Sequence, residues 1–467
     1  MTADNLVLIT IDALRHDALG CVRSDYALTP SLDALAKTGV LFEQAIANGP
    51  RTQSSFPSIM TSLYPLIAGE RRRLPRGAPT LAEVVSRGGF ATAGFNPSNP
   101  FLTRETGYDR GFDHFIDFWD VHERSGDATK PSAITRTKKN VHDAIGRKNL
   151  GFLMLMQALL LEEGGQYLTG RIITDHAMGW MEKQTGRFFL WLHFMDVHFP
   201  YQPLPGRRTW RDRLSYIHGM ASLTTGRPGP AKRALKKLYG QRVELVDGFI
   251  GDILDGIERM GLEKNTAVVV TSDHGEQLGD HGRWAHGPDL HDELIRVPLI
   301  LHGPGMGAGR RIEDQVELLG LAPTLLDLLG LPAPPSFLGA SFAPTAGGGS
   351  GVSAGPIFSE AMHSGGRRSR SGVPDTFTIT SCREDGWKYI HDTEDGGEEL
   401  FDLGADPTEV SNVVLLHPVR ASDLRRLVER HRESCSTLAA TFEDGGEPAP
   451  TPDDAEMRRR LAALGYL

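Results

Sequence analysis

The feature that most constrains the fold of this chain is a pair of short apolar runs that lead into polar residues. Leu6–Ile11 ends at Asp12, and Ala267–Thr271 is followed closely by Asp273-His274. Continuous apolar runs of roughly four to eight residues, rich in β-branched side chains, are typical of strands buried on both faces of a parallel sheet. We therefore expect both runs to be inner strands of one sheet.

Strand and helix patterns alternate over most of the chain. Thr29-Pro30 opens a helix that Gly39 ends, and the capping box Thr80-Leu81-Ala82-Glu83 opens another. The other expected strands are Phe90–Phe95, Phe188–His193 and Val297–Leu301, and the other expected helices include Leu235–Met260 and Val316–Leu329. Strands that alternate with helices predict βαβ units, and hence an α/β fold with a mainly parallel sheet flanked by helices.

The last part of the chain has a different pattern. Residues 332–355 are rich in Pro, Gly, Ala and Ser, as is typical of a loop or boundary. Beyond them lie the strand patterns Asp375–Ser381, Trp387–His391 and Glu399–Leu403, the helix pattern Pro418–Thr441 and a short terminal helix pattern at Ala455–Leu467. We predict a catalytic α/β domain over residues 1–345, with a helical insertion at about 121–175, and an α+β subdomain over 356–467 with an antiparallel sheet and the terminal helix.

Composition and charge exclude several classes of protein. The 467 residues include 50 Lys and Arg against 59 Asp and Glu, a net charge of −9, so we expect no nucleic-acid partner, because phosphate binding needs a dominant basic face. The cysteines Cys21, Cys382 and Cys435 form neither a disulfide framework nor a C-x-x-C zinc motif.

The N-terminus lacks a basic leader, and the longest apolar stretch, Phe152–Leu161, is shorter than the roughly 18 residues of a spanning helix. We therefore expect no membrane span and a cytoplasmic location; the sequence carries no signal of oligomeric state.

The polar residues at the strand ends form a candidate metal site. Asp12 and the pair Asp273-His274 follow two expected strands, and His198 follows a third, in Asp196-Val197-His198. In open α/β sheets, ligands bind at the carboxyl ends of the strands. Carboxylate oxygens suit Ca²⁺, Mg²⁺ or Mn²⁺, and an imidazole nitrogen adds Zn²⁺ to the choice. A turn explains any one of these residues, but their occurrence at three strand ends favours a divalent metal ion.

Several motifs spread along the chain carry a resemblance to a known family. They are LITIDALRHDALGC, TPSLDALAKTGVLFEQAIANGP, SLYP, DVHFPY, SDHGEQLGDHGRWAHG, ELFDLGADPTEVSNV and LAALGYL. With them the sequence resembles the sulfatases of the alkaline phosphatase superfamily. The resemblance implies a mixed, mainly parallel sheet, a smaller C-terminal domain with an antiparallel sheet, and a metal-dependent hydrolase of sulfate or phosphate esters. By motif position Asp12, Asp273 and His274 would be metal ligands, although Ala13 stands where many sulfatases carry a second Asp.

The nucleophile is where the sequence departs furthest from the family pattern. Most sulfatases use a Cys or Ser in C/S-x-P-x-R, which is oxidised to formylglycine, and this motif is absent here. Alignment of Thr61–Pro65 on the family's T-G-x-Y-P places Thr52 at the nucleophile position. Ser55 is the alternative, but its register needs Arg where Ile59 stands, and a chain without a nucleophile is the third possibility. We expect no formylglycine, and a Thr52 hydroxyl activated as a metal ligand.

Other residues are assigned roles around this threonine. We expect Arg51 and Asp196 to bind substrate, and His198 to protonate the leaving alcohol, because histidine is the usual proton donor near neutral pH. His286 falls where typical sulfatases carry a sulfate-binding lysine. It would bind the anion when protonated, or would complete a second metal site with Asp196 and His198 when neutral. One metal ion is expected and a second stays open.

The expected substrate is a small anionic ester. Formylglycine hydrate has a second hydroxyl that expels sulfate from the intermediate, whereas water must attack a Thr52 ester. That step is routine for phosphate esters, so the absent aldehyde favours a phosphate ester over a sulfate ester. A two-metal phosphodiesterase or phosphoryl-transfer enzyme of the same superfamily is the alternative, and a non-catalytic binding protein on this fold is a further one.

Overall fold

The computed structural model describes residues 2–23, 28–69, 73–97, 99–117, 169–201, 203–204, 216, 219, 229–349, 355–368 and 374–442. The strands are β1 (Asn5–Ile11), β2 (Val40–Ile46), β3 (Ala91–Phe95), β4 (His114–Ile116), β5 (Phe188–Phe194), β6 (Thr266–Ser272), β7 (Gln277–Leu278), β8 (Trp284–Ala285), β9 (Arg296–His302), β10 (Arg310–Glu317), β11 (Ile357–Arg368), β12 (Pro374–Glu384), β13 (Trp387–Asp392) and β14 (Glu398–Asp402). The helices are α1 (Pro30–Thr38), α2 (Thr52–Thr61), α3 (Pro65–Ala68), α4 (Leu81–Arg87), α8 (Thr169–Met181), α10 (Gly229–Arg259), α11 (Asp292–Ile295), α12 (Leu321–Leu329), α13 (Ala343–Ala346) and α14 (Pro418–Ala439).

An eight-stranded sheet organises the larger part of the chain, in the order β10-β2-β9-β6-β1-β5-β3-β4. Strand β9 runs antiparallel to both of its neighbours, and the other neighbouring pairs are parallel. The expectation of a mixed, mainly parallel sheet is therefore confirmed. Ile11 at the end of β1 lies opposite Phe194 of β5 and Ser272 of β6, so the carboxyl ends of these three strands are level.

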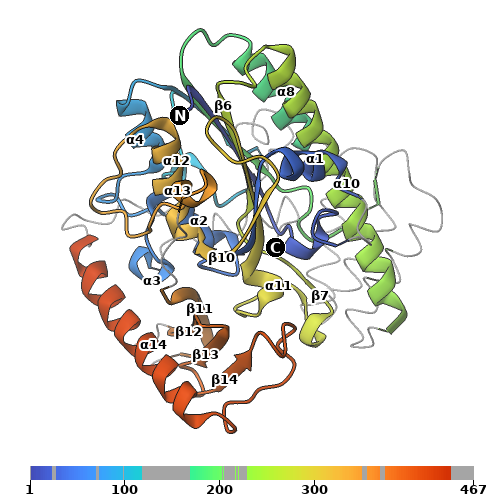
Figure 1. Cartoon of the computed structure of the whole chain (residues 1–467). Helices are drawn as coiled ribbons and strands as arrows, with labels where there is room; N and C mark the ends of the chain where they lie inside the picture. The colour runs from blue at the N-terminus through green and yellow to red at the C-terminus, as the bar shows by residue number, and fades with distance from the viewer. Residues whose placement is uncertain are drawn as a thin grey trace, which may run out of the picture.

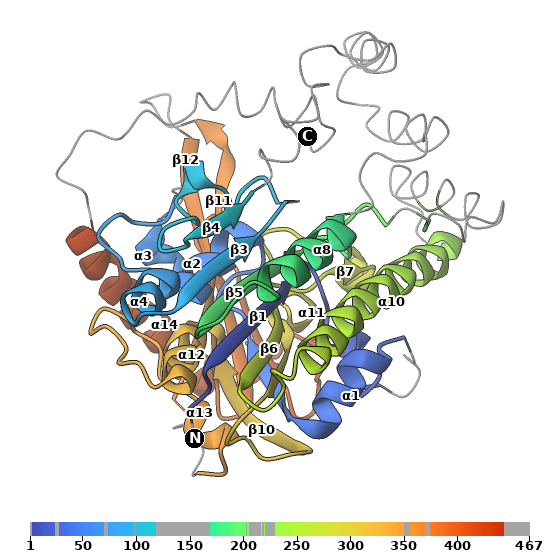
Figure 2. The same cartoon turned by 90° about the horizontal axis from the view of Figure 1, so that it is seen from above.

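Helices cover both faces of this sheet, which explains why β1 is buried at every position and mostly apolar. Leu6 and Leu8 pack into a core that α2, α4 and α12 share. Val7, Ile9 and Ile11 point to the opposite face, into a core shared with α1, α8 and α10. Figure 2 shows the two groups of helices on either side of the strands.

A separate antiparallel sheet in the C-terminal region has the order β11-β12-β13-β14. Figure 1 shows this small sheet apart from the large one, with α14 beside it. Its three expected strands and the helix α14 are confirmed, whereas β11 was not predicted. The expected helix Val316–Leu329 is wrong in its first part, because Val316 pairs with Ala45 as a residue of β10 and the α-helix begins only at Leu321.

Some sequence expectations lie outside the described residues. They are residues 121–168 of the helical insertion, with the apolar stretch Phe152–Leu161, and the terminal helix Ala455–Leu467. The last residues of the expected insertion, 169–175, are helical and belong to α8, whose Ile173 packs in the core beside β5. None of the described helices combines the length and the apolar character that a membrane span requires.

A buried ion network joins the small sheet to the large domain. Lys388 of β13 is fully buried, and its Nζ lies 2.8 Å from Asp292 Oδ1 of α11 and 2.7 Å from Glu409 Oε1. Arg383 of β12 adds a second cation, 2.7 Å from the same Asp292 oxygen. Two carboxylates and two cations thus compensate one another where α11 meets the small sheet.

Replacement of Lys388 tests this junction. The Lys388→Ala variant leaves Asp292 and Glu409 buried beside one remaining cation, and we expect it to lower the free energy of unfolding by about 3–5 kcal/mol. Denaturant unfolding measures the effect, with the exposed Lys264→Ala as the matched control, for which we expect a change within about 0.5 kcal/mol. Equal stability of the two variants would contradict the role given to the network.

Candidate active site

Four neighbouring strands deliver polar residues to one edge of the large sheet. Asp12 follows β1, Asp273 and His274 follow β6, His198 lies four residues beyond β5, and Asn99 lies four residues beyond β3. These strands stand side by side in the order β6-β1-β5-β3. The carboxyl ends of adjacent parallel strands meet at one edge of a sheet, so these side chains share one region.

Three of these side chains converge on one point. Asp12, Asp273 and His274 are fully buried, and one ligand atom from each lies within 4.8 Å of the others. His274 Nε2 is 3.5 Å from Asp12 Oδ1 and 3.6 Å from Asp273 Oδ2. None of these three atoms has a hydrogen-bond partner among the described residues. We call these residues the carboxylate–histidine cluster.

The proton positions in the cluster suit a cation. His274 Nδ1 lies 2.8 Å from the carbonyl of Gly275, so it carries the proton and leaves a lone pair on Nε2. Three lone-pair atoms therefore face one another without a donor between them. Buried acceptors left unpaired in this way are costly, and a divalent ion bound by two carboxylates and one imidazole would satisfy all three.

The pKa shifts follow from the same crowding. Burial and the neighbouring Asp12 carboxylate raise the pKa of Asp273 well above its ordinary value. Burial raises the pKa of Asp12, but the nearby imidazoles of His198, His193 and His274 lower it, and the net shift is downward. Burial and the neighbouring His286 lower the pKa of His274 to about 3, so its ring is neutral. A neutral imidazole can act as a metal ligand at neutral pH.

The backbone at Ala13 holds the end of β1 in place. Ala13 has a φ of 60°, which is a strained conformation for a residue with a Cβ. Its N–H donates to Asp273 Oδ1 at 3.4 Å, and its carbonyl accepts from the Tyr239 hydroxyl at 2.9 Å. Both backbone groups of this turn are thus tied to β6 and α10, with Asp12 directly beside them.

Two further residues orient the other oxygen of Asp12, and the sequence did not single out either as functional. Asn99 Nδ2 donates to Asp12 Oδ2 at 3.1 Å, and His193 Nε2 lies 3.6 Å from the same oxygen. His193 is itself held by Thr10, whose Oγ1 lies 2.9 Å from Nδ1. In the sequence His193 is only the last residue of the expected strand Phe188–His193, and Asn99 stands in a loop that carries no motif to mark it.

Thr52 is the first residue of α2 and reaches the cluster. Its hydroxyl donates to Asp12 Oδ2 at 3.2 Å. The amides of Ser54 and Ser55 bond to the carbonyl of Arg51, so the amides of Thr52 and Gln53 are the ones directed beyond the start of the helix. Ser55, the alternative nucleophile, is fully buried, and its Oγ has no hydrogen-bond partner among the described residues.

Two histidines stand above the cluster. The rings of His198 and His286 have centroids 4.8 Å apart, and the ring of His286 lies 4.5 Å from that of His274. His198 Nδ1 donates to the carbonyl of Phe199 at 2.5 Å, so Nε2 is the ring nitrogen that this bond leaves available. Unlike the cluster, both side chains are partly exposed.

Glu276 accompanies His286 and was not predicted, although it lies inside the SDHGE motif. Its fully buried Oε1 is 3.0 Å from His286 Nδ1. Burial alone would lower the pKa of His286, but the Glu276 carboxylate outweighs it and the net pKa is raised. The pair therefore favours an imidazolium, which can bind an anion.

The two expected substrate-binding residues lie in different places. Arg51 donates through Nη2 to the carbonyl of Met362 on β11, so its guanidinium lies on the side of the site that faces the small sheet. Its charge is also close enough to His286 to act to lower the pKa of that imidazole. Asp196 packs beside α8, where a Cβ built on Gly170 would come within 3.1 Å of its Oδ2. Among the described residues, the groups able to hold a metal ion do not include Asp196, His198 and His286 as a second site.

Comparison with known proteins places this site in context. The family model described as Sulfatase matches residues 4–331, and the model described as N-sulphoglucosamine sulphohydrolase, C-terminal, matches residues 279–433. A sulfatase of Formosa agariphila is 25% identical over 463 residues, with 87% of this chain and 82% of the relative covered. A Delta 4,5-hexuronate-2-O-sulfatase of Bacteroides thetaiotaomicron is 23% identical over 503 residues, with 99% and 94% covered. The solved phosphonate monoester hydrolase of Agrobacterium radiobacter shares the fold, with a TM-score of 0.65 at 22% identity over 94% of this chain and 96% of that one.

Removal of one cluster carboxylate tests the cation site without reference to activity. In metal-free protein, Asp273→Asn relieves the burial of a second carboxylate, so we expect its stability to equal or exceed that of the wild type. Saturation with Mn²⁺ or Mg²⁺ at about 100 times the dissociation constant stabilises the wild type by about 2.7 kcal/mol, and we expect the variant to lose this gain. Thermal unfolding with and without the ion measures both effects.

The control is the exposed Asp327→Asn, which keeps the ion-dependent gain. An undiminished gain in Asp273→Asn would show that the ion binds elsewhere.

Proposed function

This chain belongs to the sulfatase family of ester hydrolases, and we propose that it hydrolyses phosphate or phosphonate esters through a covalent intermediate on Thr52. The observation that carries the proposal is the position of the Thr52 hydroxyl, 3.2 Å from Asp12 at the edge of the carboxylate–histidine cluster. The similarity to a phosphonate monoester hydrolase supports the substrate class, and the similarity to sulfatases makes sulfate esters the comparison to test.

Asp12, Asp273 and His274 are the residues that would hold a divalent cation, with the Thr52 oxygen beside them. Such an ion supplies positive charge that favours ionisation of a hydroxyl and draws charge from an oxygen of the ester. The chain prepares its own part of the site: Asn99 and His193 fix the second oxygen of Asp12, so that Oδ1 stays directed at the cluster.

Thr52 is better placed than Ser55 to act as the nucleophile. Its hydroxyl contacts the cluster, and it stands at the start of α2, where the amides of the first turn and the helix dipole favour an anion. Ser55 lies one turn further into the helix and is fully buried. An ester bound at the start of α2 would therefore meet Thr52 first.

The partly exposed histidines act on the ester from the open side. His286, kept cationic by Glu276, binds a non-bridging oxygen together with Arg51. His198 donates its Nδ1 proton to the Phe199 carbonyl, and in its imidazolium form it gives its second proton, on Nε2, to the departing alcohol. The Thr52 hydroxyl passes its proton to the Asp12 oxygen that accepts from it, and the Thr52 oxygen forms the new bond as the alcohol leaves with the proton of His198. Water then gives a proton back to His198 as it attacks the Thr52 ester, the acid is released, and Thr52 recovers its own proton from Asp12.

A substrate panel with two nucleophile variants tests the proposal. We expect wild-type enzyme to cleave aryl phosphate and phosphonate esters faster than the matched aryl sulfate, because water has to release the acid from Thr52. Thr52→Ala is expected to lower kcat by roughly 10³-fold or more, while Ser55→Ala stays near the wild type. Initial rates in Ca²⁺, Mg²⁺, Mn²⁺ and Zn²⁺, and mass spectrometry of acid-quenched enzyme, measure the rates and the covalent adduct.

Unchanged turnover in Thr52→Ala would rule out this nucleophile. Sulfate release much faster than phosphate or phosphonate hydrolysis would overturn the substrate class and leave the nucleophile standing.

The role of His198 can be tested by comparing esters whose leaving alcohols differ in their need for a proton. We expect His198→Gln to lower kcat for an alkyl ester by about 10²-fold or more, because an alkoxide needs a proton to depart. For a nitrophenyl ester the loss is expected to be small, since nitrophenolate leaves unprotonated. His302→Gln is the control, because His302 lies opposite Val268 at the amino end of β6, away from the site. Equal losses for both esters would contradict proton donation by His198.

A further inference from the structure

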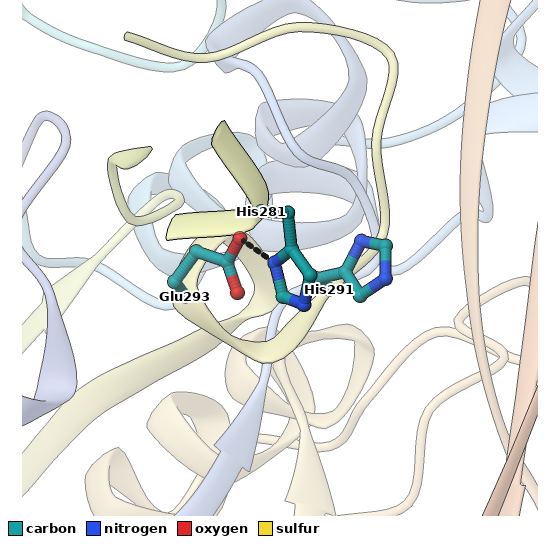
Figure 3. Close-up of side chains that lie close together, drawn as sticks. All are labelled: His281, His291 and Glu293. Atoms are coloured by element: carbon teal, nitrogen blue, oxygen red, sulfur yellow. Dashed lines mark hydrogen bonds and ion pairs between the residues drawn. The ribbon is translucent and has the colours of Figure 1, made fainter. Parts of the chain in front are cut away.

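A second group of metal-ligating side chains lies on the loop that carries Glu276 and His286. His281 follows β7, His291 precedes α11 and Glu293 belongs to α11, and one ligand atom from each lies within 4.8 Å of the others. Figure 3 shows the Glu293 carboxylate directed at the His281 ring, with His291 beside it. The two imidazole rings stack with centroids 3.9 Å apart.

The hydrogen bonds of His281 leave one nitrogen facing a carboxylate. His281 Nε2 lies 3.1 Å from the carbonyl of Glu409, which only accepts, so Nε2 carries the proton. In the neutral ring Nδ1 then holds a lone pair, and it lies 2.9 Å from Glu293 Oε1. Two lone pairs at this distance need a cation between them, either a second proton on the ring or a metal ion.

His291 also has one protonated nitrogen and one lone pair, but here Nδ1 carries the proton and Nε2 holds the lone pair. Its Nδ1 lies 2.5 Å from Asp289 Oδ1 and so carries the proton, which leaves the lone pair on Nε2. That nitrogen is 3.8 Å from Glu399 Oε2 of β14, a further carboxylate within reach. Each histidine therefore donates one N–H to an oxygen and presents the other nitrogen as a ligand, which is the usual pattern of metal-bound histidine.

The carboxylate ligand has a supporting contact as well. Gln277 Nε2 donates to Glu293 Oε1 at 3.0 Å and to Asp289 Oδ2 at 2.7 Å, so one amide orients both carboxylates. His281 itself has a φ of 50°, a conformation that costs energy in a residue with a Cβ, and its side chain is 19% exposed. The site is thus preformed on its buried side and open to ions on the other.

We propose that His281, His291 and Glu293 form a divalent-cation site of the zinc class, separate from the carboxylate–histidine cluster, with Glu399 as a fourth ligand. Two imidazole nitrogens with carboxylate oxygens suit Zn²⁺ better than Mg²⁺ or Ca²⁺, which prefer oxygen. The inference is independent of the proposed function, because it uses none of the residues assigned to the reaction.

The site would connect the active-site loop to the small sheet. The amide of Glu276 donates to the carbonyl of Glu293 at 3.0 Å, and Glu276 in turn holds His286. On the other side, Glu399 and the Glu409 carbonyl belong to the C-terminal region. An ion bound here would therefore hold the segment from Gln277 to Glu293 against β14.

Metal stoichiometry in the full-length chain tests the site. The Asp273→Asn variant impairs the carboxylate–histidine cluster, so we expect metal-stripped Asp273→Asn to bind one Zn²⁺ per chain, with Mg²⁺ in excess to occupy any oxygen-rich site. Adding His281→Ala or His291→Ala is expected to weaken this binding by about 10-fold or more, whereas the exposed His114→Ala leaves it unchanged. Calorimetric titration and elemental analysis measure affinity and content, and circular dichroism checks that each variant is folded.

Co²⁺ provides a readout that does not depend on the double variants. We expect Co²⁺ bound to Asp273→Asn to give the intense visible absorption of a four-coordinate site with nitrogen ligands, and Zn²⁺ to abolish it by displacement. Failure of Asp273→Asn to bind Zn²⁺ would overturn the proposal, and so would binding that folded His281→Ala and His291→Ala variants leave unchanged. In those cases a second proton on His281 bridges Glu293, and the proposed reaction is unaffected.

Discussion

The constraint around which the site is built is the burial of two carboxylates side by side at the ends of adjacent strands. Asp12 and Asp273 are fully buried, and the charge of each makes the ionised form of the other less favourable. The surrounding groups stabilise only one oxygen of each carboxylate: Asn99 and His193 contact Asp12 Oδ2, and backbone amides donate to Asp273 Oδ1. The other oxygens and His274 Nε2 face one another without a hydrogen-bond partner among the described residues. Hydrogen-bond acceptors therefore point into the centre of the cluster, and the donors lie around its outside, which is the arrangement that binds a cation.

Much of this arrangement could be predicted because it follows from local patterns. The apolar runs before Asp12 and Asp273 identify inner strands, neighbouring parallel strands then bring their ends together, and the capping box at Thr80 is formed as its sequence indicates. The sequence could not identify Asn99 as part of the site, because Asn99 and Asp12 are 87 residues apart and only the folded sheet brings them into contact. It also misassigned Val316, whose apolar spacing fits a helix but which pairs with β2 instead.

The small C-terminal sheet contributes to the site although it carries none of the cluster residues. Arg51, next to Thr52, bonds to a carbonyl of β11, and the buried Lys388 ties β13 to α11. The carbonyl of Glu409 holds His281 at the base of the loop that carries His286. The start of α2 and the active-site loop are therefore both supported from outside the large sheet, so damage to the small sheet is expected to reach the reaction centre.

The central claim is that one divalent ion binds where the strand ends converge. Anomalous diffraction from crystals of the full chain grown with Mn²⁺ tests it most directly, because the signal locates the ion without reference to turnover. The account predicts a peak about 2 Å from Asp12 Oδ1, Asp273 Oδ2 and His274 Nε2, with the Thr52 oxygen beside it. A well-ordered site with no peak among these atoms, in crystals that hold Mn²⁺ elsewhere, would contradict it.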